Sequence, residues 1–145
     1  MAELSENESS FLTTILEFLK RFEWEPESVE NSDGQITITL IAQLDIKEVK
    51  IYIKFNETSH WMYFSALFIN NVSNNQFDVY KRLLEINYST TLTKFGISDK
   101  GSIYALTELS LQFIDYEEFL AALRRLTNDI NTYLLPIATM IRGSD

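Results

Sequence analysis

Cysteine is absent from this chain, and histidine occurs once, at position 60. Without thiols the chain can form no disulfide framework, no thiolate metal site and no cysteine nucleophile. The four glycines, at positions 34, 96, 101 and 143, do not form a phosphate-binding loop. No apolar run is long enough to cross a bilayer, and the acidic start MAELSENESS is unlike a signal peptide. These absences predict a cytoplasmic protein without metal, cofactor or membrane attachment.

Positive charge is also scarce, because 12 Lys and Arg stand against 21 Asp and Glu, for a net charge of −9. Residues 1–33 hold nine of the acidic side chains and only two basic ones. Acidic surfaces repel phosphate backbones, so we expect no nucleic-acid partner. The acidic stretch is either a solvated segment or a docking surface for a basic partner. We expect one domain over residues 1–145, with residues 1–8 as a disordered acidic tail.

What the chain does contain is apolar: 46% of its residues are hydrophobic and 13% aromatic, enough for a real core in 145 residues. Apolar side chains at helical spacing predict an amphipathic helix over Ser9 to Phe22, which Pro26 prevents from continuing. Alternating apolar and polar residues then predict strands over Ile36 to Leu44 and Val49 to Phe55. The segment from Trp61 to Ile69 is apolar on both faces, which predicts a strand covered on two sides.

The second half of the chain again shows helical spacing followed by strand alternation. A helix is predicted over Phe77 to Asn87, followed by strands over Leu92 to Ile97 and Ser102 to Leu111. Gly101 supplies the positive φ that the turn between these strands needs. The predicted order is therefore α-β-β-β-α-β-β-α, an α+β fold with a five-stranded antiparallel sheet and helices on one of its faces.

The last helix opens at Asp115 and Glu118, which have the spacing of a capping box. Apolar residues at helical spacing then continue to Ile141. Pro136 lies inside that pattern, and a proline lacks the amide that an interior helical position donates. We therefore predict a kink or a break near Tyr133.

Groups that carry catalysis are poorly represented. His60 is expected to be structural or exposed, and Glu117 and Glu118 to stabilise the first turn of a helix. Because the constellations that catalysis needs are missing, we expect no enzymatic activity, which would require a carboxylate and a hydroxyl or Tyr gathered in one cleft. Each predicted helix also carries a basic pair that either faces solvent or meets the acidic region of a second subunit. These pairs are Lys20-Arg21, Lys81-Arg82 and Arg124-Arg125.

The predicted sheet has more apolar surface than three helices can cover. We expect some of its side chains to be buried by another polypeptide, as in a homodimer or a peptide-binding face, although a wholly internal arrangement is the alternative. The residues in question are Tyr52, Met62, Phe64, Ala66, Phe68, Tyr104 and Leu106.

The segment LLEINYSTTLTKFGISDKGSIYALTELSL, residues 83–111, combines a helix end, a strand through Lys94-Phe95-Gly96, a polar turn and an alternating strand. With the helix start at Asp115 to Phe119, it resembles the type III secretion chaperone-like fold. Within that fold the chain looks most like the YbjN-type sensory transduction regulators. The resemblance covers nearly the whole chain at the level of topology.

This resemblance implies a small acidic homodimer that binds a segment of another protein without ATP. The dimer contact would be made by Phe77, Tyr80 and Leu84. The client segment would lie on the exposed sides of residues 36–55 and 11–22.

The predicted function is a non-enzymatic, dimeric protein-binding module that acts as a chaperone or regulator. Its alternative is a small-ligand-binding sensory module with a pocket between the sheet and the C-terminal helix near Pro136. The predicted partner or dimer surface consists of Tyr52, Phe64, Phe68, Phe77, Tyr80, Leu84 and Tyr104.

Overall fold

A computed structural model describes residues 2–56, 58 and 60–143, with side chains described from residue 11 onward. Three helices and six strands follow one another along these residues. They are α1 (Ala2–Arg21), β1 (Ser28–Ser32), β2 (Gln35–Gln43), β3 (Glu48–Asn56), β4 (Trp61–Ile69), α2 (Gln76–Ser89), β5 (Lys94–Ile97), β6 (Ile103–Ser110) and α3 (Tyr116–Arg142).

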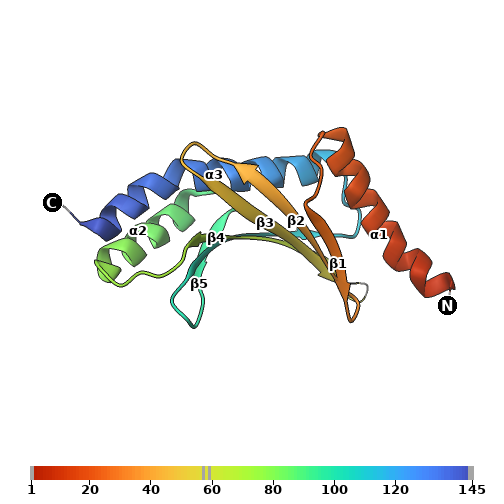
Figure 1. Cartoon of the computed structure of the whole chain (residues 1–145), viewed down its shortest axis with the longest axis horizontal. Helices are drawn as coiled ribbons and strands as arrows, with labels where there is room; N and C mark the ends of the chain where they lie inside the picture. Colours follow the sequence, from red (N-terminus) through yellow and green to blue (C-terminus); the bar gives the residue numbers. More distant parts are fainter. Residues whose placement is uncertain (1, 57, 59, 144–145) are drawn as a thin grey trace.

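The strands form one antiparallel sheet in the order β1-β2-β3-β4-β6-β5, which is twisted and strongly curved (Figure 1). The predicted α+β class and antiparallel pairing are confirmed. The predicted count of five strands is wrong, because β1 adds a sixth at the edge. Its sequence, SVENS, is polar and almost wholly exposed, so the apolar alternation that identifies a half-buried strand is missing.

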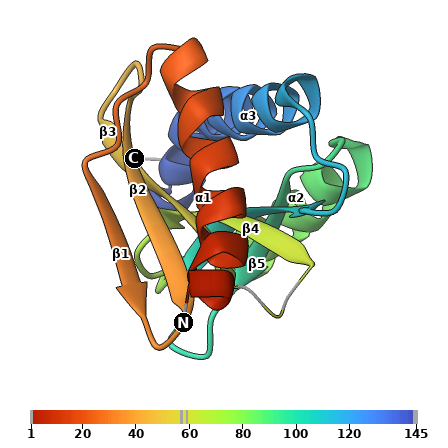
Figure 2. The same ribbon diagram turned by 90° about the vertical axis from the view of Figure 1, so that its right-hand side faces the viewer.

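Alternation along the central strands builds the core. In β3 the side chains of Val49, Ile51, Ile53 and Phe55 are buried, while the intervening side chains lie on the other face. Helix α3 crosses the buried face, with α2 beside it and α1 near the β1–β3 end of the sheet (Figures 1 and 2). The opposite face of the sheet is left without a helix, as expected for helices packed on one side (Figure 2).

Helix α1 is longer than predicted, since it begins at Ala2 rather than Ser9. Ile15 and Leu19 point into the core and are fully buried. Phe18 packs its ring 5.7 Å from that of Tyr116 and 5.5 Å from that of Phe119, which joins α1 to α3. The side chains of residues 1–8 lie outside the described residues, so the acidic tail stays a prediction.

Helix α3 opens as predicted, because the Asp115 carboxylate accepts a hydrogen bond of 2.8 Å from the amide of Glu118. It then runs without interruption through Pro136 to Arg142. Of the kink or break predicted near Tyr133, the break is therefore wrong. Pro136 and Thr132 are both exposed, and water can therefore reach the Thr132 carbonyl that lacks its usual donor. Buried Leu134 and Ile137 hold both sides of the proline against the core.

Candidate protein-binding surfaces

Helix α2 has two apolar stripes, and only one of them faces the core. Val79, Leu83 and Ile86 are buried against the sheet and α3. On the other side Phe77 is 78% exposed and Leu84 is 68% exposed. Their spacing of seven residues places them on the same side of the helix, two turns apart. We refer to Phe77, Tyr80, Leu84 and Tyr88 as the α2 stripe.

A hollow of about 250 Å³ opens beside this stripe, between α2 and β5. Its lining is almost entirely apolar, with the rings of Tyr80 and Phe95 on its walls and Ile97 at the sheet edge, itself exposed. Apolar side chains that project next to an apolar hollow can pack against a second copy of themselves. The remaining lining residues are Leu83, Leu84, Asn87, Gly96 and Ile103.

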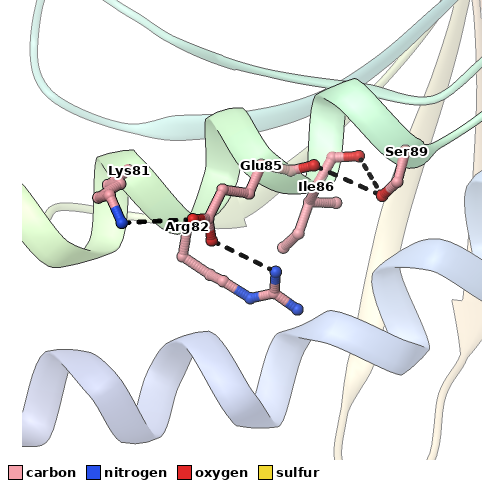
Figure 3. Close-up of polar contacts among 5 residues, drawn as sticks. All are labelled: Lys81, Arg82, Glu85, Ile86 and Ser89. Carbon is pink, nitrogen blue, oxygen red and sulfur yellow. Dashed lines mark hydrogen bonds and ion pairs between the residues drawn. The ribbon is translucent and has the colours of Figure 1, made fainter.

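Charged side chains flank the α2 stripe. Figure 3 shows Lys81 and Arg82 both directed to Glu85, with N–O distances of 3.4 Å and 3.5 Å. All three side chains are half exposed, so each pair contributes only a few tenths of a kcal/mol. The hydroxyl of Ser89 donates to the carbonyls of Glu85 and Ile86 at the end of the helix (Figure 3). Within one chain the Lys81-Arg82 pair is exposed and paired with Glu85, and a contact with the acidic region of a second subunit stays a prediction.

Asn87, in the last turn of α2, covers the open edge of β5. Its side-chain amide donates to the Phe95 carbonyl at 3.0 Å and accepts from the Phe95 amide at 2.8 Å. These are the two bonds that a neighbouring strand would make to an edge residue. The next outward carbonyl, that of Thr93, accepts from the hydroxyl of Thr90. The β5 edge is therefore closed to strand addition over these residues.

Replacing Asn87 by Ala should remove both bonds and leave the Phe95 backbone groups without their partner. We expect the free energy of unfolding to fall by about 1–3 kcal/mol and self-association to increase. Urea denaturation and light scattering measure these two effects. Asn128→Ala, at an exposed amide on α3, is the control and should neither lower the stability nor increase self-association. An unchanged stability of Asn87→Ala would contradict the role given to this amide.

The face of the sheet without helices carries a second apolar surface. Trp61 is 49% exposed and Tyr63 is 44% exposed, and Leu67 and Leu106 are also exposed. The exposed face of an antiparallel sheet is normally polar, so large side chains at its centre are unusual. We refer to this set as the outer sheet patch. It consists of Tyr52, Trp61, Tyr63, Leu67, Tyr104 and Leu106.

Strand pairing makes the patch continuous. Ser65 in β4 lies opposite Tyr52 of β3 on one side and opposite Leu106 of β6 on the other. Two residues along β4, on the same face, Leu67 lies opposite Tyr104. The small side chain of Ser65 therefore lies between the larger side chains of Tyr52 and Leu106 on the two neighbouring strands.

Charged side chains lie at the sides of this patch, on β3 and β6. Lys54 lies opposite Tyr63, and its ammonium group is 5.8 Å from the centre of the Tyr52 ring. Glu108 lies on the other side of Tyr63. An apolar centre with a mixed polar rim is the usual composition of a protein-binding surface.

Two of the predicted surface residues are not on any surface. Phe64 is 0% exposed and Phe68 is 1% exposed, with ring centres 5.6 Å from Phe119 and 4.7 Å from Phe95. They belong to the inward face of β4 together with Met62 and Ala66, so their prediction as partner residues is wrong. The outward face carries Trp61, Tyr63, Ser65 and Leu67 instead.

The remaining predicted surface residues fall into two separate groups. Phe77, Tyr80 and Leu84 lie on α2, whereas Tyr52 and Tyr104 lie half-buried on the outer face of the sheet. Sequence reasoning missed the exposed members of β4. A usable signal was present, because Met62, Phe64, Ala66 and Phe68 have no side-chain N or O atom, and only such a set can enter a dry core without hydrogen bonds.

The residues considered for chemistry are all exposed. His60 is exposed just before β4, and Glu117 and Glu118 are exposed in the first turn of α3. Among the described residues, no cluster of three or more His, Asp or Glu side chains could hold a metal ion. No helix in the described part of the chain is long and apolar enough to span a membrane.

Solved structures with the same fold include a complex of the type III secretion chaperone SycH of Yersinia pestis, which matches with a TM-score of 0.53 and 12% identity, covering 84% of this chain and 98% of that one. A chain of the HopA1–SchA chaperone–effector complex matches with a TM-score of 0.61 and 12% identity, covering 87% of this chain and 94% of that one. For the ExsC–ExsE complex the TM-score is 0.62 with 14% identity, covering 87% and 92%. For the ExoU–SpcU heterodimer of Pseudomonas aeruginosa it is 0.58 with 18% identity, covering 83% and 94%. At these identities the likeness shows a shared fold.

Among curated proteins no similar sequence is found. A family model does match, over residues 12–136, and that family is YbjN, described as "Putative bacterial sensory transduction regulator". The match extends from within α1 almost to the end of α3, and thus includes all six strands and α2. The chain therefore belongs to the YbjN family and has the fold of the type III secretion chaperones.

Proposed function

We propose that this protein is a non-enzymatic homodimer that binds a segment of another protein, as a chaperone or a regulator. The observation that carries the proposal is the outer sheet patch. Its large side chains stay exposed at the centre of a sheet whose other face is fully packed. Burying such a side chain stabilises a complex by about 1.5–3 kcal/mol before the loss of freedom on association is counted.

The α2 stripe is assigned to the dimer. A two-fold axis crossing α2 would place Phe77 of one copy over the Asn87–Tyr88 turn of the other, because antiparallel helices pair early residues with late ones. Leu84 would then lie close to the axis, beside Tyr80 of the second copy. The apolar hollow between α2 and β5 gives this contact a matching surface.

The outer sheet patch is assigned to the client segment. The patch spans β3, β4 and β6, so a chain laid across it could contact several exposed rings at once. Proteins of this fold have been solved as a chaperone–effector complex and as a heterodimeric complex. Both support a role in which the partner is a polypeptide.

Leu84→Asp tests the dimer. The wild-type chain should show twice its 16.9 kDa mass by light scattering after size exclusion, and the variant should show the monomer mass. A carboxylate at the centre of an apolar contact loses its hydration without gaining a partner. Leu135→Asp is a matched control, since Leu135 is also an exposed leucine on a helix, and it should remain dimeric. A monomeric wild type, or a dimeric Leu84→Asp, would contradict the assignment.

A further inference from the structure

A groove of about 360 Å³ lies where the middle of α3 meets the β2–β3 hairpin and the turn after α1. One wall is apolar and aromatic, and the other is a row of polar side chains from α3. This volume lies within the range of small-molecule sites, and none of its lining residues belongs to the α2 stripe or the outer sheet patch. The lining residues are Phe22, Trp24, Ile41, Ala42, Gln43, Leu44, Asp45, Leu123, Arg124, Thr127, Asn128 and Asn131.

The polar wall follows from spacing along α3. Arg124, Thr127, Asn128 and Asn131 stand at i, i+3, i+4 and i+7, which places them on one side of the helix. The hydroxyl of Thr127 is used within the helix, where it donates to the carbonyls of Leu123 and Arg124. Arg124 and Asn128 also line the groove from α3, and Asn131 lies at its far end.

Arg124 is held in place without being neutralised. Its guanidinium carbon lies 5.2 Å from the centre of the Phe22 ring, a cation–π contact that orients the planar group. None of the ion pairs formed among the described residues involves Arg124. An oriented guanidinium with free N–H groups is suited to a carboxylate, which it binds through two parallel hydrogen bonds.

The opposite end of the groove is closed by hydrogen bonds. The Asp45 amide donates to the Asn131 side-chain oxygen at 3.0 Å, and the Asn131 side-chain nitrogen donates to the Asp45 carboxylate at 3.1 Å. Seven residues of helix separate this end from Arg124, about 10 Å along the axis. The Asp45 carboxylate disfavours a second negative charge at this end.

Between the two ends lies the aromatic wall. The indole N–H of Trp24 donates to the Ile41 carbonyl at 3.2 Å, which fixes the ring at the side of the groove. Leu44 and Leu123 add apolar surface next to it. A flat apolar body therefore fits along Trp24, with one anionic group at the Arg124 end.

We infer that this groove binds a small aromatic monocarboxylate, with the carboxylate on Arg124 and the ring along Trp24. The ligand is one that this chain could sense independently of any protein client. The site lies between the sheet and α3, several residues before Pro136.

The test uses 1-naphthoate as the probe and the two indole N–H signals of the ¹⁵N-labelled protein as the readout. Trp61→Phe assigns the signals, because only Trp24 and Trp61 are present. Titration with 1-naphthoate should shift the Trp24 signal and leave that of Trp61, on the outer sheet patch, in place. A shift of Trp61 alone, or no shift of either signal, would overturn the inference.

Arg124→Gln and Arg125→Gln form the matched pair of variants, since both arginines are exposed neighbours but only Arg124 lines the groove. Arg124→Gln should weaken 1-naphthoate at least about tenfold, the loss expected for a charge-assisted hydrogen bond, and Arg125→Gln should not. Neutral 1-naphthamide should bind both variants and the wild type equally. Equal weakening by both variants would overturn the role of Arg124. Light scattering of the same samples reports on the proposed dimer separately.

Discussion

Phe64→Ala is expected to lower the free energy of unfolding by about 3–5 kcal/mol. The Phe64 ring is fully buried and packs edge-on against Phe119 at 5.6 Å, at the junction of β4 and α3. Truncation leaves a cavity that the neighbouring side chains can fill only in part. Urea denaturation monitored by circular dichroism measures the loss.

Tyr63→Ala is the matched comparison, because Tyr63 precedes Phe64 in the same strand and its side chain lies on the exposed face. Its loss should be about 1 kcal/mol or less, as for most surface substitutions. Equal losses for the two variants would mean that the two faces of β4 are not distinguished as described. A larger loss for Tyr63→Ala than for Phe64→Ala would mean that Tyr63, and not Phe64, lies on the buried face.

The double variant Trp61→Ser with Tyr63→Ser is expected to lose client binding by a factor of about 100 or more. Both side chains are large aromatic groups of the outer sheet patch, the kind of residue that contributes most to binding at protein interfaces. The measurement is the amount of partner protein that the immobilised chain retains from an extract of its native cells. The variant should remain folded and dimeric.

Ile46→Ser provides the control for this second prediction. Ile46 is also an exposed apolar residue, but it lies in the β2–β3 turn and outside the patch. Retention of the same partner by Ile46→Ser and its loss by the double variant is the expected pattern. Unchanged retention of the partner by the double variant would show that the outer sheet patch does not bind the client.

Local sequence patterns predicted most of the elements, but the alternation of apolar residues alone could not orient β4. Strand β3 alternates apolar and charged residues, so Lys50 and Lys54 identify its outer face directly. Strand β4 has apolar residues on both faces, and the period of two is then the same for either orientation. The pairing of Ile53 with Phe64 places both side chains on the buried face of the sheet. This agrees with the one signal within β4, the lack of side-chain N or O atoms on its buried set.

Exposed apolar surface on the sheet was predicted correctly in kind, although four of the residues named for it are buried, namely Met62, Phe64, Ala66 and Phe68. The exposed residues of α2 were named in part, since Phe77 and Leu84 lie outside the core while Tyr80 is half-buried. Here the signal was the resemblance rather than periodicity, because an apolar stripe at helical spacing predicts burial by default. Tyr88, almost fully exposed on the same stripe, was not identified.

Features that depend on tertiary contacts were outside the reach of the sequence. Strand β1 is polar and is recognised only through its pairing with β2, from Ser28 opposite Thr39 to Ser32 opposite Gln35. The groove at Arg124 joins segments about 100 residues apart in the chain, as Phe22 and Arg124 show. The i, i+3, i+4, i+7 polar row on α3 was visible in the sequence, but the aromatic wall opposite it was not.

Site-specific photo-cross-linking in living cells tests the central claim most directly. A photoreactive amino acid at position 84 should yield a cross-linked product containing two copies of this chain. At position 63 it should yield a product with a different polypeptide, and at exposed Glu117 it should yield neither. Absence of any product at positions 63 and 84, with the chain folded and abundant, would contradict a dimer that holds a protein segment on its sheet.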